Sequence, residues 1–296
     1  MNRSRAAFIC TLAGIATLNV FSSNAQAGPI IFTSSNEALF RIDGGTTQVF
    51  TLSQPVTSMS FDPSGTLWAT APNDSDGDSF FELYKILDPF GTPSLSLVSD
   101  GLPLNTVSIE WVGNTLYGVQ ATGPVTTRLV TIDPLNGAST LVGATGAIGA
   151  NTGGSAVDQN LGIMYGTDHG NPGNLVTIDF QLSGGPDPSA TIVGSANASL
   201  GTTGLDFWEP TNTLYAMVTE IGGASNIGLY TANTATGAFT LQQDLSGFTA
   251  IRGSAAIAVI PEPATVGLIV LGVCILRRRR RSPNTGEDAL AAPEPV

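Results

Sequence analysis

The chain has almost no cysteine and few basic residues. Only two of its 296 residues are cysteines, Cys10 and Cys274, and both lie in apolar segments near the ends. The stretch 28–260, called the body below, has no cysteine, which excludes disulfides, zinc–thiolate sites and cysteine catalysis there. The body has four basic residues against nineteen acidic ones, a net charge of −15. This charge disfavours nucleic acid and anionic membrane surfaces as partners of the body.

Histidine and the common catalytic motifs are also scarce. His169 is the only histidine, so metal sites built on several imidazoles cannot form, and a Ser-His-Asp arrangement would depend on this residue. A lone histidine in a turn of Gly, Asn and Pro residues more often belongs to the surface structure than to a catalytic or ligand site. The body contains no Gly-x-Ser-x-Gly elbow, P-loop or dinucleotide fingerprint. No motif in the sequence by itself identifies an enzyme.

The first 27 residues have the three-part build of a secretory signal peptide. A short basic region precedes an apolar stretch over residues 6–21, and Ala25-Gln26-Ala27 forms an Ala-x-Ala cleavage site. We expect cleavage after Ala27, with Ala25 and Ala27 as the recognised small residues. A permanent N-terminal membrane anchor is the alternative. With the signal peptide removed, the body would fold outside the cytoplasm.

The C-terminal segment combines a proline motif, an apolar stretch and an arginine run. Two prolines, Pro261 and Pro263, flank Glu262 and prevent a continuous helix through that point, so a helix can begin near Pro263. From Pro263 to Leu276 this helix has 14 residues, fewer than the roughly 20 that span a bilayer core. The basic residues that follow are Arg277, Arg278, Arg279, Arg280 and Arg281. The apolar stretch predicts a transmembrane helix over 264–276, and the arginines after it place the body outside the cytoplasm. The polar residues 282–296 are expected to form a disordered cytoplasmic tail.

This order of parts resembles the PEP-CTERM sorting signal, a bacterial tail recognised by exosortase, a membrane protease or transpeptidase. The segment VIPEPATVGLIVLGVCILRRRRR carries the likeness. The resemblance implies exosortase as a partner, transient anchoring in the inner membrane and cleavage near Pro261-Glu262-Pro263. The body would then be released to the cell surface or to the extracellular polysaccharide. The sequence departs from the family in continuing over residues 282–296, and an ordinary anchor that is never cut is the alternative.

The body contains a repeat of about 47 residues. A triplet of an apolar, an aromatic and a small residue recurs, and its aromatics are 49, 48 and 50 positions apart: Trp68, Tyr117, Tyr165 and Tyr215. A second strand-like element begins with a leucine, and these leucines are 44, 46, 46 and 54 positions apart. Four short strands per repeat, joined by turn residues, indicate the blade of a β-propeller. The predicted fold is therefore all-β, and the repeated aromatics are expected to pack between blades rather than to stack on sugars.

Counting the innermost strands predicts five blades. The innermost element occurs at 57–61, 107–111, 155–157, 204–207 and 255–259. The fifth has only the C-terminal segment after it, so its three missing strands must come from the start of the body, at 30–33, 39–42 and 48–52. Closing the ring in this way leaves no open sheet edge between the chain ends. A pair of β-sandwiches or a β-helix is the competing interpretation.

Repeats such as residues 129–143 also resemble those of bacterial extracellular propellers of the YVTN or NHL type. They are similar, too, to propeller domains of unknown function found on PEP-CTERM proteins. The resemblance supports the architecture only, because propellers carry unrelated functions.

One acidic loop is a candidate metal site. Asp74, Asp76 and Asp78 alternate along the loop, a spacing that calcium loops use to direct oxygens at one cation. Ser79 and Lys85 stand where an EF-hand has glycine and glutamate, so the loop is not an EF-hand. A solvated acidic turn is the alternative to a calcium site, and we expect no other cofactor.

Three further carboxylates lie in or beside the predicted innermost strands: Glu110, Asp158 and Asp206. Facing the channel, they could hold a divalent cation or act as general acid and base. Alternatively, they hydrogen-bond to the backbone of neighbouring blades or meet water in the channel.

Together these features predict an exported protein of the cell surface or extracellular matrix. Its propeller would be a non-catalytic binding or structural module, with extracellular polysaccharide as a candidate partner. The alternative is an extracellular hydrolase, similar to lactonases, that uses channel carboxylates with a divalent cation. Three convergent carboxylates in the channel would favour the enzyme, and an apolar or filled channel would favour the binding module.

Overall fold

The computed structural model describes residues 28–258, apart from residues 36, 73–80, 103–105, 124–125, 170–171, 198–199, 221–226 and 249–250. The predicted signal peptide, the sorting signal and the loop with Asp74, Asp76 and Asp78 lie outside the described residues. Within the described part of the chain, no helix has the length and apolar character needed to span a bilayer. Residues 28–259 form one compact unit.

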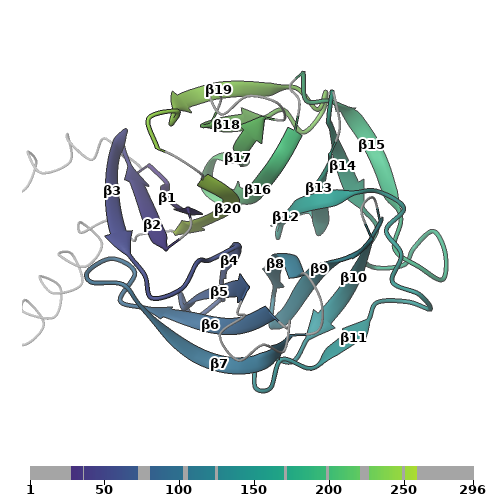
Figure 1. The fold of residues 1–296 in the computed structure, drawn as a ribbon. Helices are drawn as coiled ribbons and strands as arrows, with labels where there is room; N and C mark the ends of the chain where they lie inside the picture. The colour runs from purple at the N-terminus through teal and green to yellow at the C-terminus, as the bar shows by residue number, and fades with distance from the viewer. Residues whose placement is uncertain are drawn as a thin grey trace, which may run out of the picture. The chain divides into compact units, whose positions relative to one another are not determined.

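The body is a ring of five antiparallel four-stranded sheets, as Figure 1 shows. From the innermost strand outward, the first blade consists of β20 (Ile251–Ala258), β1 (Ile30–Ser35), β2 (Ala38–Asp43) and β3 (Thr46–Thr51). The second consists of β4 (Ser58–Phe61), β5 (Leu67–Pro72), β6 (Phe81–Leu87) and β7 (Ser94–Leu102). The third consists of β8 (Thr106–Val112), β9 (Thr115–Gly123), β10 (Thr126–Ile132) and β11 (Ser139–Leu141).

The last two blades follow the same order. The fourth consists of β12 (Thr152–Asp158), β13 (Ile163–Asp168), β14 (Asn174–Ile178) and β15 (Ala190–Ser195). The fifth consists of β16 (Leu200–Trp208), β17 (Thr213–Glu220), β18 (Ile227–Ala232) and β19 (Phe239–Asp244), with the 3-10 turn η1 (Glu209–Thr211) between its first two strands. The predicted five-bladed propeller is confirmed, and the β-sandwich and β-helix interpretations are wrong.

The ring closes inside the first blade, where the two ends of the body pair. β1 is antiparallel to β20, with Ile30 opposite Ala258 and Phe32 opposite Ala256. One blade therefore contains three strands from the start of the body and one from its end, as the strand count predicted. This pairing covers the sheet edges that an open ring would expose.

Five clusters of buried side chains hold the blades together, and each lies between two neighbouring blades. The repeated aromatics take part, because Trp68 packs against Trp111 of the next blade at 5.6 Å between ring centroids. Tyr165 stacks on Phe207 of the next blade at 6.2 Å. The predicted packing role of the aromatics is therefore confirmed for these residues.

The position after each repeated aromatic holds a small residue for a steric reason. A Cβ at Gly118 would lie 2.6 Å from Cδ1 of Ile132, and one at Gly166 would lie 2.9 Å from Cδ1 of Ile178. Both isoleucines are buried. Glycine or alanine at this position lets the long aliphatic side chain of the neighbouring strand fill the space between blades.

Three innermost strands begin three or four residues earlier than the repeat predicts, and one of them is β20, which starts at Ile251 rather than at residue 255. β12 starts at Thr152 rather than at residue 155, and β16 starts at Leu200 rather than at 204. The glycines at 153, 154 and 201 weaken a strand pattern in the sequence, since glycine is depleted in strands. These extra residues lie at one end of the channel.

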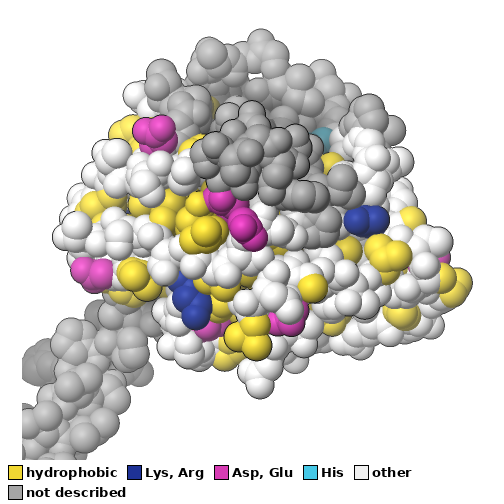
Figure 2. Space-filling view, turned by 60° about the horizontal axis from the view of Figure 1, so that its bottom comes forward, with side chains coloured by type: hydrophobic (Ala, Val, Ile, Leu, Met, Phe, Trp, Pro, Cys, Tyr) yellow, Lys and Arg dark blue, Asp and Glu magenta, His cyan; other side chains and the backbone are white. Residues whose placement is uncertain are grey.

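Charged side chains are sparse on the described part of the face that Figure 2 shows. On the face shown in Figure 2, backbone and uncharged side chains make up most of the described surface, and acidic, basic and hydrophobic groups are scattered among them.

Candidate functional site

Side chains of one blade satisfy the free inner edge of the next. Ser58 Oγ accepts a hydrogen bond from the backbone N–H of Ile109 at 2.8 Å, and Ser60 Oγ accepts one from Trp111 at 3.1 Å. In the next blade, Ser108 Oγ accepts the N–H of Ser155 at 3.0 Å. An innermost strand has a partner strand on one side only, so its other row of N–H groups needs such acceptors when it is buried.

Glu110 and Asp206, two of the carboxylates predicted in or beside the innermost strands, also accept backbone N–H groups of the next blade. Glu110 accepts hydrogen bonds from the Ser60 hydroxyl at 3.3 Å and from the backbone N–H of Val157 in the next blade. Asp206 accepts the N–H of Phe207 at 2.7 Å and that of Ile257 in the next blade. Both carboxylates are therefore already engaged by backbone donors, in the manner of the serines.

Burial and mutual repulsion shift the protonation of this pair. Burial raises the pKa of Glu110 well above its ordinary value, and the negative charge of Asp206 raises it further. Burial also raises the pKa of Asp206, to about 7, although the N–H groups of Ile257 and Phe207 oppose the rise. Two carboxyls that interact in this way titrate as a pair, and burial of both charges at once is unfavourable. Burial and repulsion therefore both favour a protonated form of the pair.

Asp158 does not join the other two. Its Oδ1 accepts the N–H of Leu161 at 2.9 Å, in the turn between β12 and β13. Nearby, Glu209 accepts hydrogen bonds from Gln159 and Asn160, and burial together with the charge of Asp158 raises the pKa of Glu209. Among the described residues, no three His, Cys, Asp or Glu side chains gather in a way that could hold a metal ion. The convergence of three carboxylates that would have favoured the enzyme alternative is thus not found among the described residues.

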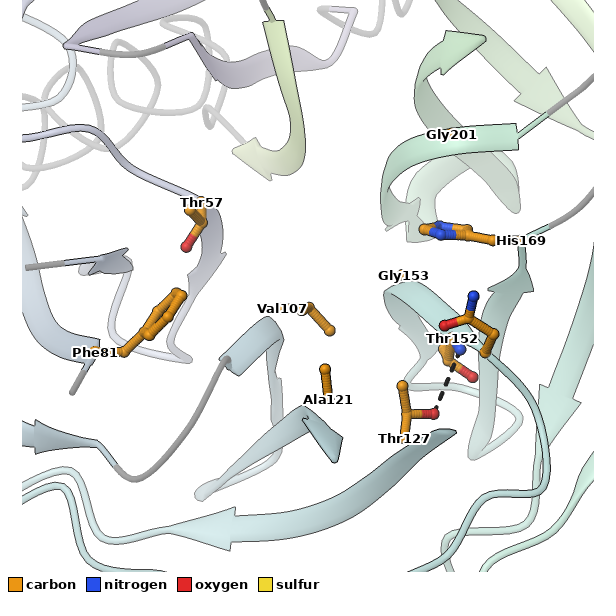
Figure 3. Close-up of a pocket in the computed structure, with 10 residues that line it drawn as sticks. Thr57, Phe81, Val107, Ala121, Thr127, Thr152, Gly153, His169 and Gly201 are labelled. Atoms are coloured by element: carbon orange, nitrogen blue, oxygen red, sulfur yellow. Dashed lines mark hydrogen bonds between the residues drawn. The ribbon is translucent and has the colours of Figure 1, made fainter. Parts of the chain in front are cut away.

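A cavity of about 400 Å³ lies at the end of the channel where the innermost strands begin. It is within the size range of small-molecule sites. Its described lining residues are Thr57, Phe81, Val107, Ala121, Thr127, Asn151, Thr152, Gly153, His169 and Gly201. Figure 3 shows Phe81 and His169 reaching into the space from opposite sides.

The polar groups of two adjacent lining residues have no partner. The hydroxyl of Thr152, a residue only 1% exposed, makes no hydrogen bond within the described structure. The half-buried carboxamide of Asn151 likewise bonds to no other described residue. The backbone of Asn151 is firmly held, because its N–H donates to Asp168 Oδ1 and its carbonyl accepts the N–H of His169, both at 3.1 Å. The Thr152 oxygen is itself shielded from the cavity, so the carboxamide of Asn151 is the polar group that this fixed backbone holds at the cavity wall.

His169 lies in this cavity rather than in the exposed turn that the sequence indicates. Its ring packs directly on Gly153, where a Cβ would lie 1.8 Å from Nε2 of the imidazole. Burial lowers the pKa of His169, and the charge of Asp168 only partly offsets this. At neutral pH the ring is therefore uncharged, with one nitrogen as donor and one as acceptor.

Sequence reasoning considered His169 but none of the other lining residues. Thr57, Val107, Thr152 and Gly201 come from the starts of four innermost strands or just before them. The signal that could have found them is positional: in a ring of blades, equivalent strand starts meet at one end of the channel. The loop with Asp74, Asp76 and Asp78 lies outside the described residues, and its calcium site stays a prediction.

Comparison with known proteins does not assign the chain to a family. No protein-family signature matches the chain, and no curated protein does. Among solved structures, the chain is similar to TolB from Acinetobacter baumannii, with 13% identity over 73% of this chain and 53% of that one, and a TM-score of 0.45. It spans about half the length of that protein.

Two other solved structures are similar at the same level. One is a protein of unknown function from Bacteroides caccae, with 10% identity over 77% of this chain and 98% of that one, and a TM-score of 0.47. The other is the PQQ-bound aldose sugar dehydrogenase from Streptomyces coelicolor, with 13% identity over 77% of this chain and 81% of that one, and a TM-score of 0.42. At such values the likeness decides nothing about the activity of this chain.

Proposed function

We propose that the protein is exported and sorted to the cell surface. The three-part N-terminal segment and the order of Pro261-Glu262-Pro263, apolar stretch and arginine run support this proposal. Signal peptidase would cut after Ala27, and exosortase would cut near Pro261-Glu262-Pro263. Intact mass of the exported protein, with and without exosortase in the host, tests this. A stable membrane form that ends at Val296, with no shorter surface form, would contradict it.

We propose further that the propeller is a non-catalytic binding module whose ligand site is the cavity at the channel end. The carboxamide of Asn151, which lies in the cavity wall and bonds to no other described residue, carries this proposal. No described carboxylate lines the cavity. Glu110 lies three residues beyond the lining residue Val107, and Asp206 lies five beyond Gly201, which is roughly 10 and roughly 17 Å further along the innermost strands at 3.3 Å per residue. A hydrolase would need an acid in reach of the ligand.

Retention on the extracellular polysaccharide of the native host tests the binding function. The exported body should sediment with this material and release no soluble saccharide from it. Asn151→Ala should lower retention, because it removes polar groups from the cavity wall while leaving the backbone contacts intact. Glu110→Gln should be retained as well as the native body. Release of soluble fragments that Glu110→Gln abolishes would overturn the proposal in favour of the hydrolase.

A further inference from the structure

We propose that, while the C-terminal segment holds the chain in the membrane, one end face of the propeller lies against the bilayer surface and the cavity opens away from it. This face, called the turn face below, is formed by the turns at the end of the channel where the innermost strands end. The inference rests on the proposed sorting of the chain and adds the contact surface of the anchored body. It joins three observations: where the chain leaves the ring, how short its connection to the apolar stretch is, and which side chains the turn face exposes.

Both ends of the body leave the ring at the turn face. β20 is the innermost strand of the first blade, and its last residue, Ala258, lies opposite Ile30, the first residue of β1. The cavity lies at the other end of the channel, because Thr57, Val107 and Thr152 in its wall lie at or next to the starts of innermost strands. Figure 1 shows β20 beside the centre of the ring. The chain that continues toward the membrane therefore starts near the middle of the turn face.

The connection from β20 to the predicted membrane segment is short. Residues 259–263 separate Ala258 from the apolar stretch that begins at Ala264, and a chain of this length spans at most about 22 Å in any conformation. Three strands lie outside β20 in its blade, so a path from β20 to the rim takes roughly 15 Å at about 4.8 Å per strand. A path along the rim to the cavity end adds roughly 26 Å, the length of a strand of eight residues. The connection is too short for this path, so it keeps the turn face toward the bilayer.

The turn face exposes large apolar side chains. Leu135, in the turn between β10 and β11, is 84% exposed, and Leu161, in the turn between β12 and β13, is 69% exposed. Leu87 at the end of β6 and Phe90 in the turn after it are 48% and 41% exposed. Because neighbouring strands of a blade are antiparallel, these positions all lie at the end where the innermost strands end. Apolar side chains at such turns leave water when they enter the interfacial region of a bilayer.

The same turns carry carboxylates, so the contact depends on the connection to the membrane. Asp88 and Asp133 are exposed and accept the backbone N–H groups of Thr92 and Leu135. Their negative charge repels anionic headgroups, and a few apolar side chains do not outweigh this repulsion for a free body. The short connection instead keeps the turn face at a high effective concentration beside the bilayer. The contact therefore ends when the chain is cut near Pro261-Glu262-Pro263.

The experiment measures the distance of two fluorescent labels from the bilayer surface. The chain without its signal peptide, residues 28–296, is placed in phosphatidylcholine vesicles whose headgroups carry a nitroxide quencher. The body has no cysteine, so Cys274→Ala allows one labelling cysteine at a time. Asn114→Cys places a label in the exposed turn between β8 and β9 on the turn face, and Ser246→Cys places one at an exposed site after β19, at the cavity end.

We expect the label at position 114 to be quenched several-fold more strongly than the label at position 246. Equal quenching of the two labels, or stronger quenching at position 246, would overturn the orientation.

Paired substitutions test the apolar contact itself. Leu135→Ser combined with Leu161→Ser removes the two most exposed apolar side chains of the turn face and should lower the quenching at position 114. Leu141→Ser combined with Leu241→Ser is the matched control, because these leucines are exposed on the outermost strands β11 and β19. The control should be quenched as the native chain is. If both pairs of substitutions leave the quenching unchanged, the apolar side chains do not contact the bilayer and the docking surface is wrong.

The lipid composition and the free body test the role of the connection. Residues 28–260 alone should not sediment with phosphatidylcholine vesicles, and sedimentation of this free body would overturn the dependence on the connection. Replacing part of the phosphatidylcholine by phosphatidylglycerol at low salt should lower the quenching at position 114. Added salt should restore it, because salt screens the carboxylates from the headgroups. Stronger quenching with the anionic lipid would contradict the repulsion assigned to Asp88 and Asp133.

The outcomes separate this inference from the proposed sorting. If residues 28–296 do not insert into vesicles and are extracted by alkaline carbonate, the membrane anchor is wrong, and both the sorting and the docking fail. If the chain inserts and the native host cuts it near Pro261-Glu262-Pro263, but the two labels are quenched equally, the sorting stands and the docking surface alone is overturned.

Discussion

Glu110 and Asp206 show how one position can hold different residues for the same structural purpose. Ser60 and Glu110 occupy equivalent places in successive blades, since each accepts an N–H from the innermost strand that follows it. A carboxylate is the stronger acceptor, but its burial has an electrostatic cost that a serine does not have. Asp206 bears the same cost and adds repulsion to Glu110. The protonation of these two acids should therefore make the stability of the ring depend on pH.

The free energy of unfolding of the body should fall as the pH rises from acidic to neutral values. The pKa of Asp206 is raised to about 7 from 3.8, and that of Glu110 is raised well above its ordinary value. A carboxyl with a raised pKa keeps its proton in the folded state at a pH where the unfolded chain has lost it. The folded state then binds more protons, so the free energy of unfolding decreases with rising pH. We expect a loss on the order of a few kcal/mol between about pH 4 and about pH 8.

Urea unfolding at several pH values measures this loss. Glu110→Gln keeps the shape of the side chain and removes both its titration and its repulsion of Asp206, so the stability curve should become flatter. Asp100→Asn, at an exposed site on β7, should leave the curve as it is. An identical pH dependence in Glu110→Gln and the native body would show that the pair is ionised in the folded state without cost.

At the scale of the elements, the strands were predictable and the cavity was not. The aromatic triplet and the leucine element recur because each blade packs the same face on its neighbour, so Trp68 or Leu129 carries a local signal. Asn151 and Thr152 carry no such repeated signal in the sequence. Their role follows from the meeting of strand starts from four blades, and glycines there obscure the strand pattern. Glu110 and Asp206 were located correctly in innermost strands, but their backbone partners depend on the register between blades.

The inner edges of the sheets yield a prediction at this scale. Ser58 Oγ accepts the N–H of Ile109 at 2.8 Å, and Ser58 is buried. Ser58→Ala would leave this N–H of the next blade buried without an acceptor, so we expect a loss of about 1–3 kcal/mol in the free energy of unfolding. Urea unfolding measures it, with Ser94→Ala at the exposed start of β7 as the control. Equal stability of both variants would mean that water in the channel replaces the serine.

For the whole molecule, the decisive contact is between the two ends of the body. Residues far apart in sequence, β1 and β20, pair within one sheet, and the blade packs on the second blade through Phe32 and Met59 and on the fifth through Ile31 and Trp208. Every blade thus has two neighbours. Removing one strand of the closing blade affects two blade interfaces as well as its own sheet, so its cost should exceed that of a single core substitution.

Deletion of residues 28–36 tests this closure. The deletion removes β1, exposes the edges of β2 and β20, and takes the buried side chains of Ile31 and Phe32 out of two clusters. We expect the free energy of unfolding to fall by several kcal/mol, a large share of the 5–15 kcal/mol typical of a folded domain. Deletion of residues 28–29 alone, which precede the strand, should leave thermal unfolding nearly unchanged. If both deletions unfold like the native body, then the first blade stands without β1 and the ring does not depend on closure.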